Sequence, residues 1–146
     1  MKIICIGRNY SDHAKEMGAA IPSEPVFFMK PDTALLKENK FYYPSITNDL
    51  HYECELVVKI SKAGKCIEPE FAKNYYNQIS LGIDFTARDH QAQCKDLGLP
   101  WEKAKAFDNS APISEKWLDV AQLTFPVHFE FYQNNELKQK SNSGEM

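Results

Sequence analysis

Side chains alternate in character along the segment Leu50-His51-Tyr52-Glu53-Cys54-Glu55-Leu56-Val57-Val58-Lys59-Ile60. Successive side chains of a β-strand point to opposite faces of its sheet. The segment therefore predicts a strand, with a packed face formed by Cys54, Leu56, Val58 and Ile60 and a second face formed by His51, Glu53, Glu55, Val57 and Lys59. This strand decides the fold, because it anchors a sheet and places two carboxylates side by side.

Segments on both sides of this strand predict more strands than helices. Strands are expected over 3–7, 26–29, 79–85 and 123–131, with hairpin turns at Ala63-Gly64 and Asn134-Asn135. Helices are expected from about residue 12 to 17, from Pro69 to residue 78, and from residue 86 to Gly98. The pattern indicates an α+β, mainly β fold, a roll with short peripheral helices.

Composition limits the class of protein. The 146 residues, 43% of them hydrophobic, fit one domain over 1–146 with a real core. The net charge is -3 and basic residues form no stripe, so nucleic acid is a poor partner. The short apolar run at 3–7 fits neither a signal peptide nor a membrane span, and we expect a cytoplasmic protein. The scattered cysteines are expected to be reduced thiols.

Glu53 and Glu55 project to the same side of their predicted strand, close enough to share one cation. Neighbouring carboxylates repel each other unless a cation neutralises them, and a hard ion such as Mg²⁺ prefers oxygen ligands. Asp84, at the end of the apolar strand 79–83, is the best candidate for a third ligand. On spacing alone, a solvated strand face is the favoured explanation of Glu53 and Glu55, and capping of the next helix is an alternative role for Asp84.

A second candidate pair is His13 and Glu16, which are neighbours on one face of a helix. The carboxylate can orient the imidazole, and such a pair can activate water. An exposed pair on a short polar helix is the simpler explanation of the spacing. Lys105 has no distinguishing local pattern.

Five ordered motifs resemble the fumarylacetoacetate hydrolase family, in its small acylpyruvate hydrolase and oxaloacetate decarboxylase branch. They are Gly7-Arg8-Asn9-Tyr10-Ser11-Asp12-His13-Ala14-Lys15-Glu16, Glu24-Pro25-Val26-Phe27-Phe28-Met29-Lys30-Pro31, Leu50-His51-Tyr52-Glu53-Cys54-Glu55-Leu56, Gly82-Ile83-Asp84-Phe85-Thr86-Ala87-Arg88-Asp89, and Gly98-Leu99-Pro100-Trp101-Glu102-Lys103-Ala104-Lys105-Ala106-Phe107. The resemblance covers essentially the whole chain.

The resemblance implies a role for each matching residue. It implies that the metal ligands are Glu53, Glu55 and Asp84, holding Mg²⁺ with Mn²⁺ or Ca²⁺ as substitutes. It implies a water-activating dyad of His13 and Glu16 on a lid helix, and an active-site lysine at Lys105. The substrate-binding residues it implies are Arg88 and Gln91, with Arg8 and Lys30 as weaker candidates.

The last residues depart from the family pattern. The segment 139–146 resembles one that continues in the family into further strands and a threonine-bearing loop, and Ser141 replaces its usual glycine. We therefore expect a fold that is incomplete at the C-terminus. The resemblance also implies a homodimer when the chain is complete.

By resemblance, the expected reaction is Mg²⁺-dependent hydrolysis of a carbon–carbon bond in acylpyruvates such as fumarylpyruvate, giving pyruvate and an acid. The alternatives are an oxaloacetate decarboxylase or tautomerase, a 2-hydroxyhepta-2,4-diene-1,7-dioate isomerase, and an inactive metal-binding fragment. Each of the enzymatic alternatives takes a small keto acid as substrate.

Overall fold

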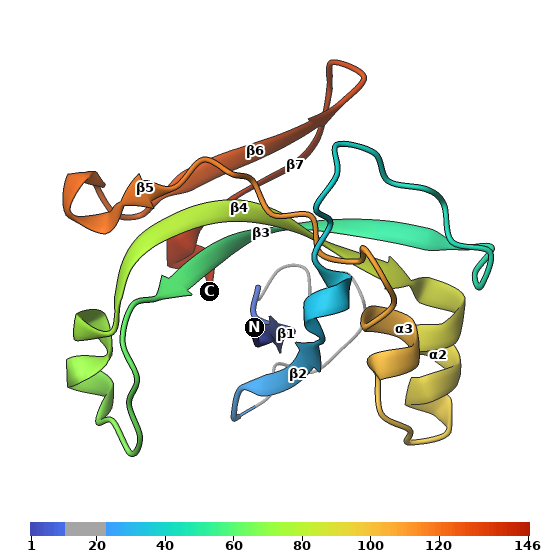
Figure 1. The fold of residues 1–146 in the computed structure, drawn as a ribbon, viewed down its shortest axis with the longest axis horizontal. Helices are drawn as coiled ribbons and strands as arrows, with labels where there is room; N and C mark the ends of the chain where they lie inside the picture. Colours follow the sequence, from blue (N-terminus) through green and yellow to red (C-terminus); the bar gives the residue numbers. More distant parts are fainter. Residues whose placement is uncertain (11–22) are drawn as a thin grey trace.

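The computed structural model describes residues 1–10 and 23–146 (Figure 1). In these ranges the strands are β1 (Ile3–Gly7), β2 (Val26–Lys30), β3 (Leu50–Ile60), β4 (Tyr76–Ala87), β5 (Leu118–Asp119), β6 (His128–Gln133) and β7 (Glu136–Asn142). The α-helices are α2 (Arg88–Asp96) and α3 (Glu102–Lys105), and 3-10 helices cover Asp32–Ala34, Pro69–Asn74, Val120–Gln122 and Ser143–Glu145. The described part is mainly β, with few and short helices, as predicted.

The long antiparallel ribbon of β3 and β4 is the centre of the fold. The predicted strand over 50–60 is confirmed, and its register with β4 places Glu53 directly opposite Asp84. Glu55 lies opposite Gly82. Residues paired in this way project to the same face of a sheet, so the acidic side chains of both strands meet on one face.

Two smaller, two-stranded antiparallel sheets lie on opposite sides of this ribbon, β1–β2 below it and β6–β7 above it in Figure 1. The Tyr52 and Phe131 rings lie 5.1 Å apart and join β3 to β6. The Gln139 side chain on β7 donates to the Tyr52 carbonyl at 2.9 Å and accepts from the Cys54 backbone N–H at 2.7 Å. A side-chain amide thus satisfies backbone groups along the edge of β3 that does not face β4.

The β6–β7 hairpin confirms the turn predicted at Asn134-Asn135. Both residues have positive φ angles, 52° and 65°, as a two-residue hairpin turn requires. Asparagine tolerates this conformation better than most residues do.

The centre of the molecule is unusually polar. The buried apolar residues include Cys5, Phe28, Ile79 and Phe129, yet the largest fully buried side chains are Lys30, Lys105, Thr86 and Ser110. Buried lysines are rare unless they are paired with carboxylates or carbonyls. Their burial therefore points to a built polar site between the β3–β4 ribbon, β2 and α3.

Residues 110–114 lie along the other edge of β4. The backbone N–H groups of Ile83 and Phe85 donate to the carbonyls of Pro112 at 2.9 Å and Ser110 at 3.0 Å. A Cβ at Gly82 would come within 2.8 Å of Val57 Cγ2 and 3.1 Å of the Pro112 carbonyl. Glycine at this position lets the segment that carries Ser110 approach the sheet.

Several predicted elements differ from the structure. The helix predicted from Pro69 to residue 78 is a 3-10 helix ending at Asn74, and β4 begins at Tyr76. The hairpin turn predicted at Ala63-Gly64 is wrong, because no strand follows it over 65–67, and residues 123–127 lie outside β6. The helix predicted from residue 86 is α2, which begins at Arg88 because Thr86 and Ala87 still belong to β4. Pairing with β3 thus decided both where the helical segment after Pro69 ended and where α2 began.

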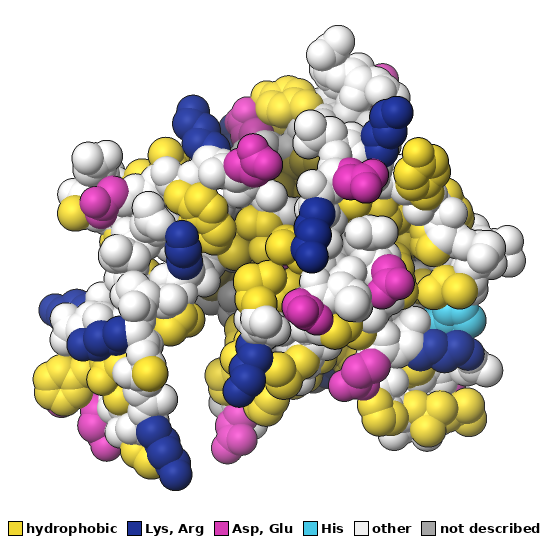
Figure 2. All heavy atoms as spheres, in the orientation of Figure 1, with side chains coloured by type: hydrophobic (Ala, Val, Ile, Leu, Met, Phe, Trp, Pro, Cys, Tyr) yellow, Lys and Arg dark blue, Asp and Glu magenta, His cyan; other side chains and the backbone are white. Residues whose placement is uncertain are grey.

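The face of β3 predicted to be packed is only partly covered. Val58 is 46% and Ile60 67% exposed. Basic and acidic side chains are interspersed over the face drawn in Figure 2, without a continuous basic patch.

Among the described residues, no helix is long and apolar enough to cross a membrane. The cysteines form no disulfide there, although Cys66 is exposed and not buried.

Candidate metal centre

Three carboxylates meet on the inner face of the β3–β4 ribbon. One oxygen from each of Glu53, Glu55 and Asp84 lies within 4.8 Å of the others, and Asp84 is buried. Glu53 and Glu55 are two apart on β3, and the strand register brings Asp84 across from Glu53. The structure thus brings together the three residues predicted as metal ligands.

Lys105 joins two of these carboxylates. Its Nζ lies 2.7 Å from Glu53 Oε2 and 2.6 Å from Asp84 Oδ2, and it donates to Thr86 Oγ1 at 2.6 Å. Helix α3 positions this side chain, and the Phe28 ring lies 5.2 Å from the ammonium. Only 2% of Lys105 is exposed, so its charge is directed into the acidic cluster.

Lys30, the last residue of β2, lies behind the cluster. Its Nζ is 2.8 Å from Asp84 Oδ1, although this approach lacks hydrogen-bond geometry. It donates to the carbonyls of Phe85 at 3.3 Å and Ser110 at 3.0 Å, to Ser110 Oγ at 3.0 Å, and to the Lys105 carbonyl. All of these oxygens belong to the protein.

Helix α2 adds a guanidinium and an amide at the rim. Arg88 donates to Glu53 Oε1 at 2.6 Å and to Gln91 Oε1 at 2.5 Å. Its Nε is buried and has no hydrogen-bond partner among the described residues. The helix start is fixed by Asp89, which accepts from Thr47 Oγ1 at 2.6 Å and from the Asn48 backbone N–H at 3.1 Å. The predicted substrate-binding residues Arg88 and Gln91 therefore lie together, next to the carboxylates.

The electrostatics shift the pKa values of Glu53 and Glu55 in opposite directions. Burial alone would raise the pKa of Glu53, but Lys105 and Arg88 outweigh it and lower that pKa to about 2. Burial, followed by the charges of Asp84 and Glu53, raises the pKa of Glu55 to about 8. Burial lowers the pKa of Lys105, yet Asp84 and Glu53 overcome burial and leave it above its ordinary value. Without a metal, Glu55 is thus the protonated member of the cluster near neutral pH.

This donor set fits a hard divalent ion. It offers only carboxylate oxygens, which Mg²⁺ and Mn²⁺ prefer over nitrogen and sulfur. Asp84 Oδ1 is buried and accepts no hydrogen bond from the described residues. The pKa of Glu55 is raised because its ionised form is buried beside Asp84 and Glu53, and a bound cation would stabilise that ionised form.

Arg8, a weaker candidate for substrate binding, lies apart from the carboxylate cluster. Arg8 is exposed, and its guanidinium carbon is 6.0 Å from the centroid of the Trp101 ring and does not contact the carboxylates. His13 and Glu16 lie outside the described residues, and their predicted dyad stays a prediction.

The structure adds residues that the sequence did not single out. Thr86 contacts Lys105, and its place two residues after Asp84 on β4 was a usable signal, because alternate residues share a face. Ser110 contacts Lys30 from a loop without any such pattern. Cys5 is buried, and burial, followed by the charges of Asp84 and Glu55, raises the pKa of its thiol to about 12, so the thiol is protonated near neutral pH.

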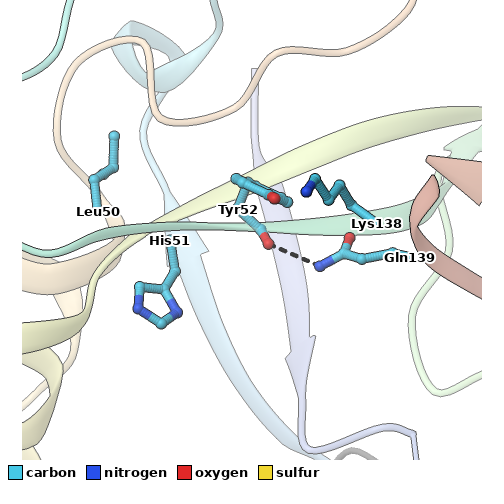
Figure 3. A pocket seen from close by; sticks show the side chains of 5 residues that line it. All are labelled: Leu50, His51, Tyr52, Lys138 and Gln139. Carbon is cyan, nitrogen blue, oxygen red and sulfur yellow. Dashed lines mark hydrogen bonds between the residues drawn. The ribbon is translucent and has the colours of Figure 1, made fainter. Parts of the chain in front are cut away.

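A separate surface groove of about 380 Å³ lies between β3 and β7 (Figure 3). It is lined by Leu50, His51, Tyr52, Lys138 and Gln139. None of the three clustered carboxylates lines it, so the groove and the candidate metal centre are distinct.

Metal binding to this cluster is expected to release a proton. Glu55, with a pKa of about 8 in the metal-free protein, holds a proton at pH 7 that a cation must displace. Calorimetric titration with Mg²⁺ or Mn²⁺ in buffers of different ionisation enthalpy should show release of about one proton at pH 7 and almost none above about pH 9.5. A heat that is independent of the buffer at pH 7 contradicts this protonation state.

Comparisons with known proteins show which family the chain resembles. Residues 2–146 match the family described as "Fumarylacetoacetate (FAA) hydrolase C-terminal". The chain is 40% identical to the mitochondrial oxaloacetate tautomerase FAHD1 of Bos taurus, covering 99% of this chain and 66% of that protein. It is 37% identical to the mitochondrial oxaloacetate decarboxylase of Dictyostelium discoideum, covering 99% of this chain and 68% of that protein.

A solved structure is also similar, that of fumarylpyruvate hydrolase from Pseudomonas aeruginosa in complex with Mn²⁺ and pyruvate. It superimposes with a TM-score of 0.90 at 37% identity, over all of this chain and 66% of that one. The chain thus spans about two thirds of the length of the proteins it resembles. The matching family, the strand-rich fold and the five motifs agree, and the chain belongs to the fumarylacetoacetate hydrolase family.

Proposed function

We propose that the protein is a metal-dependent oxaloacetate tautomerase that also decarboxylates oxaloacetate. The acylpyruvate hydrolase reading, our first expectation from sequence, becomes the second candidate, because the curated relatives described above act on oxaloacetate. The observation that carries the proposal is the contact of Lys105 with two of three clustered carboxylates.

Charge balance supports a doubly charged ligand. The three carboxylates Glu53, Glu55 and Asp84 face three cations, Lys30, Lys105 and Arg88, so the ionised cluster is neutral. A divalent ion would leave two positive charges uncompensated in a partly buried site. Oxaloacetate and the enolate of pyruvate are both dianions and would restore neutrality.

Held by Glu53, Glu55 and Asp84, a divalent ion would act as a Lewis acid that stabilises negative charge on the substrate's keto oxygen. Arg88 and Gln91, which already contact each other at the rim, would hold a substrate carboxylate and fix its orientation. These groups would present C3 of the substrate to the Lys105 ammonium.

Lys105 is the proposed proton carrier. In tautomerisation of the enol, its ammonium delivers a proton to C3 and its amine takes up the proton of the enol hydroxyl, so it ends protonated as it began. In decarboxylation the C3–C4 bond breaks, carbon dioxide leaves, and the electron pair passes to the C2 oxygen. Protonation of C3 then gives pyruvate. Both reactions would combine a divalent ion, held by the three carboxylates, with proton transfer by Lys105.

The experiment is a substrate panel with the full-length protein, stripped of metal and then supplied with Mg²⁺, Mn²⁺ or Ca²⁺. Loss of the enol absorbance of oxaloacetate, release of carbon dioxide, and release of acid from acylpyruvates are followed separately. The proposal expects metal-dependent acceleration of the first two. Cleavage of acylpyruvates alone would support the hydrolase, and no turnover with intact metal binding would support the non-catalytic reading.

Hydrolysis of acylpyruvates is the second candidate, favoured by the 0.90 TM-score to fumarylpyruvate hydrolase. It requires activated water, for which the family resemblance implies His13 and Glu16. If both activities occur, His13→Ala should lower hydrolysis by about a hundredfold or more and change decarboxylation by less than about threefold. Equal losses in both reactions would contradict a water-activating role for His13.

Two further expectations remain proposals. The homodimer implied by the family resemblance is tested by light scattering on the full-length protein. The expected cytoplasmic location has a mitochondrial alternative, because the two relatives compared above are mitochondrial. Cell fractionation distinguishes these compartments.

A further inference from the structure

We propose that Lys30 is a positioning residue that fixes the Lys105 side chain between its two carboxylates. The sequence offered Lys30 as a weak substrate-binding candidate, but only 1% of it is exposed and its contacts are with oxygens of the protein. The turnover part of this inference rests on the proposed function, whereas its structural part does not.

Lys30 holds the backbone of the residue it is proposed to position. Its ammonium donates to the Lys105 carbonyl at the end of α3. Helix α3 has four residues, too few to be stable through its own hydrogen bonds. An external cation at its last carbonyl therefore decides where the helix ends and where the Lys105 side chain starts.

Ser110 contacts both Lys30 and the Lys105 carbonyl. Its hydroxyl donates to the Lys105 carbonyl at 2.9 Å, and both its hydroxyl and its carbonyl accept from Lys30 at 3.0 Å. The Ser110 carbonyl also accepts from the backbone of Phe85 on β4. The turn after α3 is thereby tied to the strand that carries Asp84.

Lys30 also contacts the carboxylate that Lys105 contacts. The two ammonium groups lie on different oxygens of Asp84, with Lys30 at Oδ1 and Lys105 at Oδ2. One buried cation therefore fixes both the backbone of Lys105 and the partner of its side chain. Loss of this cation should release Lys105 from the cluster while its side chain stays intact.

The direct test is a crystal structure of Lys30→Met in the full-length protein, which needs no assumption about the reaction. We expect the Lys105 ammonium to leave its contacts with Glu53 and Asp84. A Lys105 side chain in its original place overturns the proposal. Lys73→Met, on the exposed 3-10 helix Pro69–Asn74, is the matched control and should leave the site unchanged.

A double-mutant cycle tests the consequence for turnover of oxaloacetate. Lys30→Met should lower kcat by about 10- to 100-fold in the wild-type protein, but by less than about threefold once Lys105→Met is present. If Lys30 merely supported the fold, Lys30→Met would lower kcat by the same factor in the wild-type protein and in Lys105→Met. Equal losses of kcat in the two proteins therefore overturn the proposal. If the wild-type protein does not act on oxaloacetate, the proposed function fails and the crystal structure still decides the role of Lys30.

Ser110→Ala covers the case in which Lys30→Met does not fold. It keeps both lysines and removes only the hydroxyl that joins them. We expect the same displacement of Lys105 in smaller measure, and a loss in kcat of about 3- to 10-fold that disappears in the Lys105→Met background. An unchanged Lys105 position in Ser110→Ala then counts against the proposal.

Discussion

Replacing Glu55 with glutamine is expected to lower metal-dependent turnover of oxaloacetate by about a thousandfold, because a lost Lewis acid costs several kcal/mol of transition-state stabilisation. The same substitution should leave the metal-free protein folded. Glutamine has the shape of the protonated glutamic acid that occupies this position near neutral pH. Glu55 also makes no ion pair with the described residues that the substitution would break.

The stability of the metal-free protein should also depend on pH differently in Glu55→Gln and in wild type. The folded-state pKa of Glu55 is raised to about 8, so its neutral form is the one that folding favours. Its contribution to stability is fully present below its ordinary pKa of about 4.5 and is lost as pH rises through about 8. In the metal-free state, Glu55→Gln should therefore have a Tm close to wild type at low pH and a higher Tm above pH 8.

Thermal unfolding in a chelating buffer between pH 5 and 9, together with turnover assays in saturating Mg²⁺, measures both effects. Glu136→Gln, at an exposed carboxylate with 71% of its side chain accessible, is the matched control and should follow wild type throughout. Full turnover by Glu55→Gln would remove Glu55 from the ligand set. A lower Tm than wild type at pH 9 would contradict its raised pKa.

The acidic face of the site was predictable from sequence because it depends on a local rule. Residues two apart on a strand share a face, so the alternation over 50–60 is sufficient to place Glu53 and Glu55 together. Asp84 was harder, since nothing local fixes which residue of β4 lies opposite Glu53. The motif resemblance supplied it, and the strand register agrees.

The basic half of the site was not predictable from local pattern. Lys105 and Lys30 look like ordinary charged residues in the sequence, and only long-range contacts bury them. Their partners come from β3, β4 and the loop at Ser110, which are separated from them by up to 80 residues. The helix predicted to continue to residue 78 failed for the same reason, because pairing with β3 converts residues from Tyr76 onward into strand.

Replacing Lys105 with methionine is expected to separate metal binding from turnover. In the metal-free protein Lys105 occupies Glu53 Oε2 and Asp84 Oδ2, two of the oxygens available to an ion. Removing its charge ends this competition, and a close charge contact is worth about 1.5 kcal/mol or more. The affinity for Mg²⁺ should therefore rise by about tenfold.

Turnover of oxaloacetate should move in the opposite direction. Lys105→Met removes the proposed proton carrier, and we expect kcat at saturating Mg²⁺ to fall by about 100- to 1,000-fold. The metal-free protein should also lose about 3–5 kcal/mol of stability, because two carboxylates lose a buried cation. Added Mg²⁺ should then raise its Tm more than it raises that of wild type.

Lys103→Met provides the control, because Lys103 lies on the same short helix with its side chain exposed. It should match wild type in Mg²⁺ affinity, Tm and kcat. A Lys105→Met protein that binds Mg²⁺ more tightly and still turns over at the wild-type rate would leave Lys105 only a charge-balancing role. A protein that loses Mg²⁺ affinity along with turnover would instead show that Lys105 builds the ligand geometry. Only tighter binding combined with lost turnover supports Lys105 as the group that moves the proton.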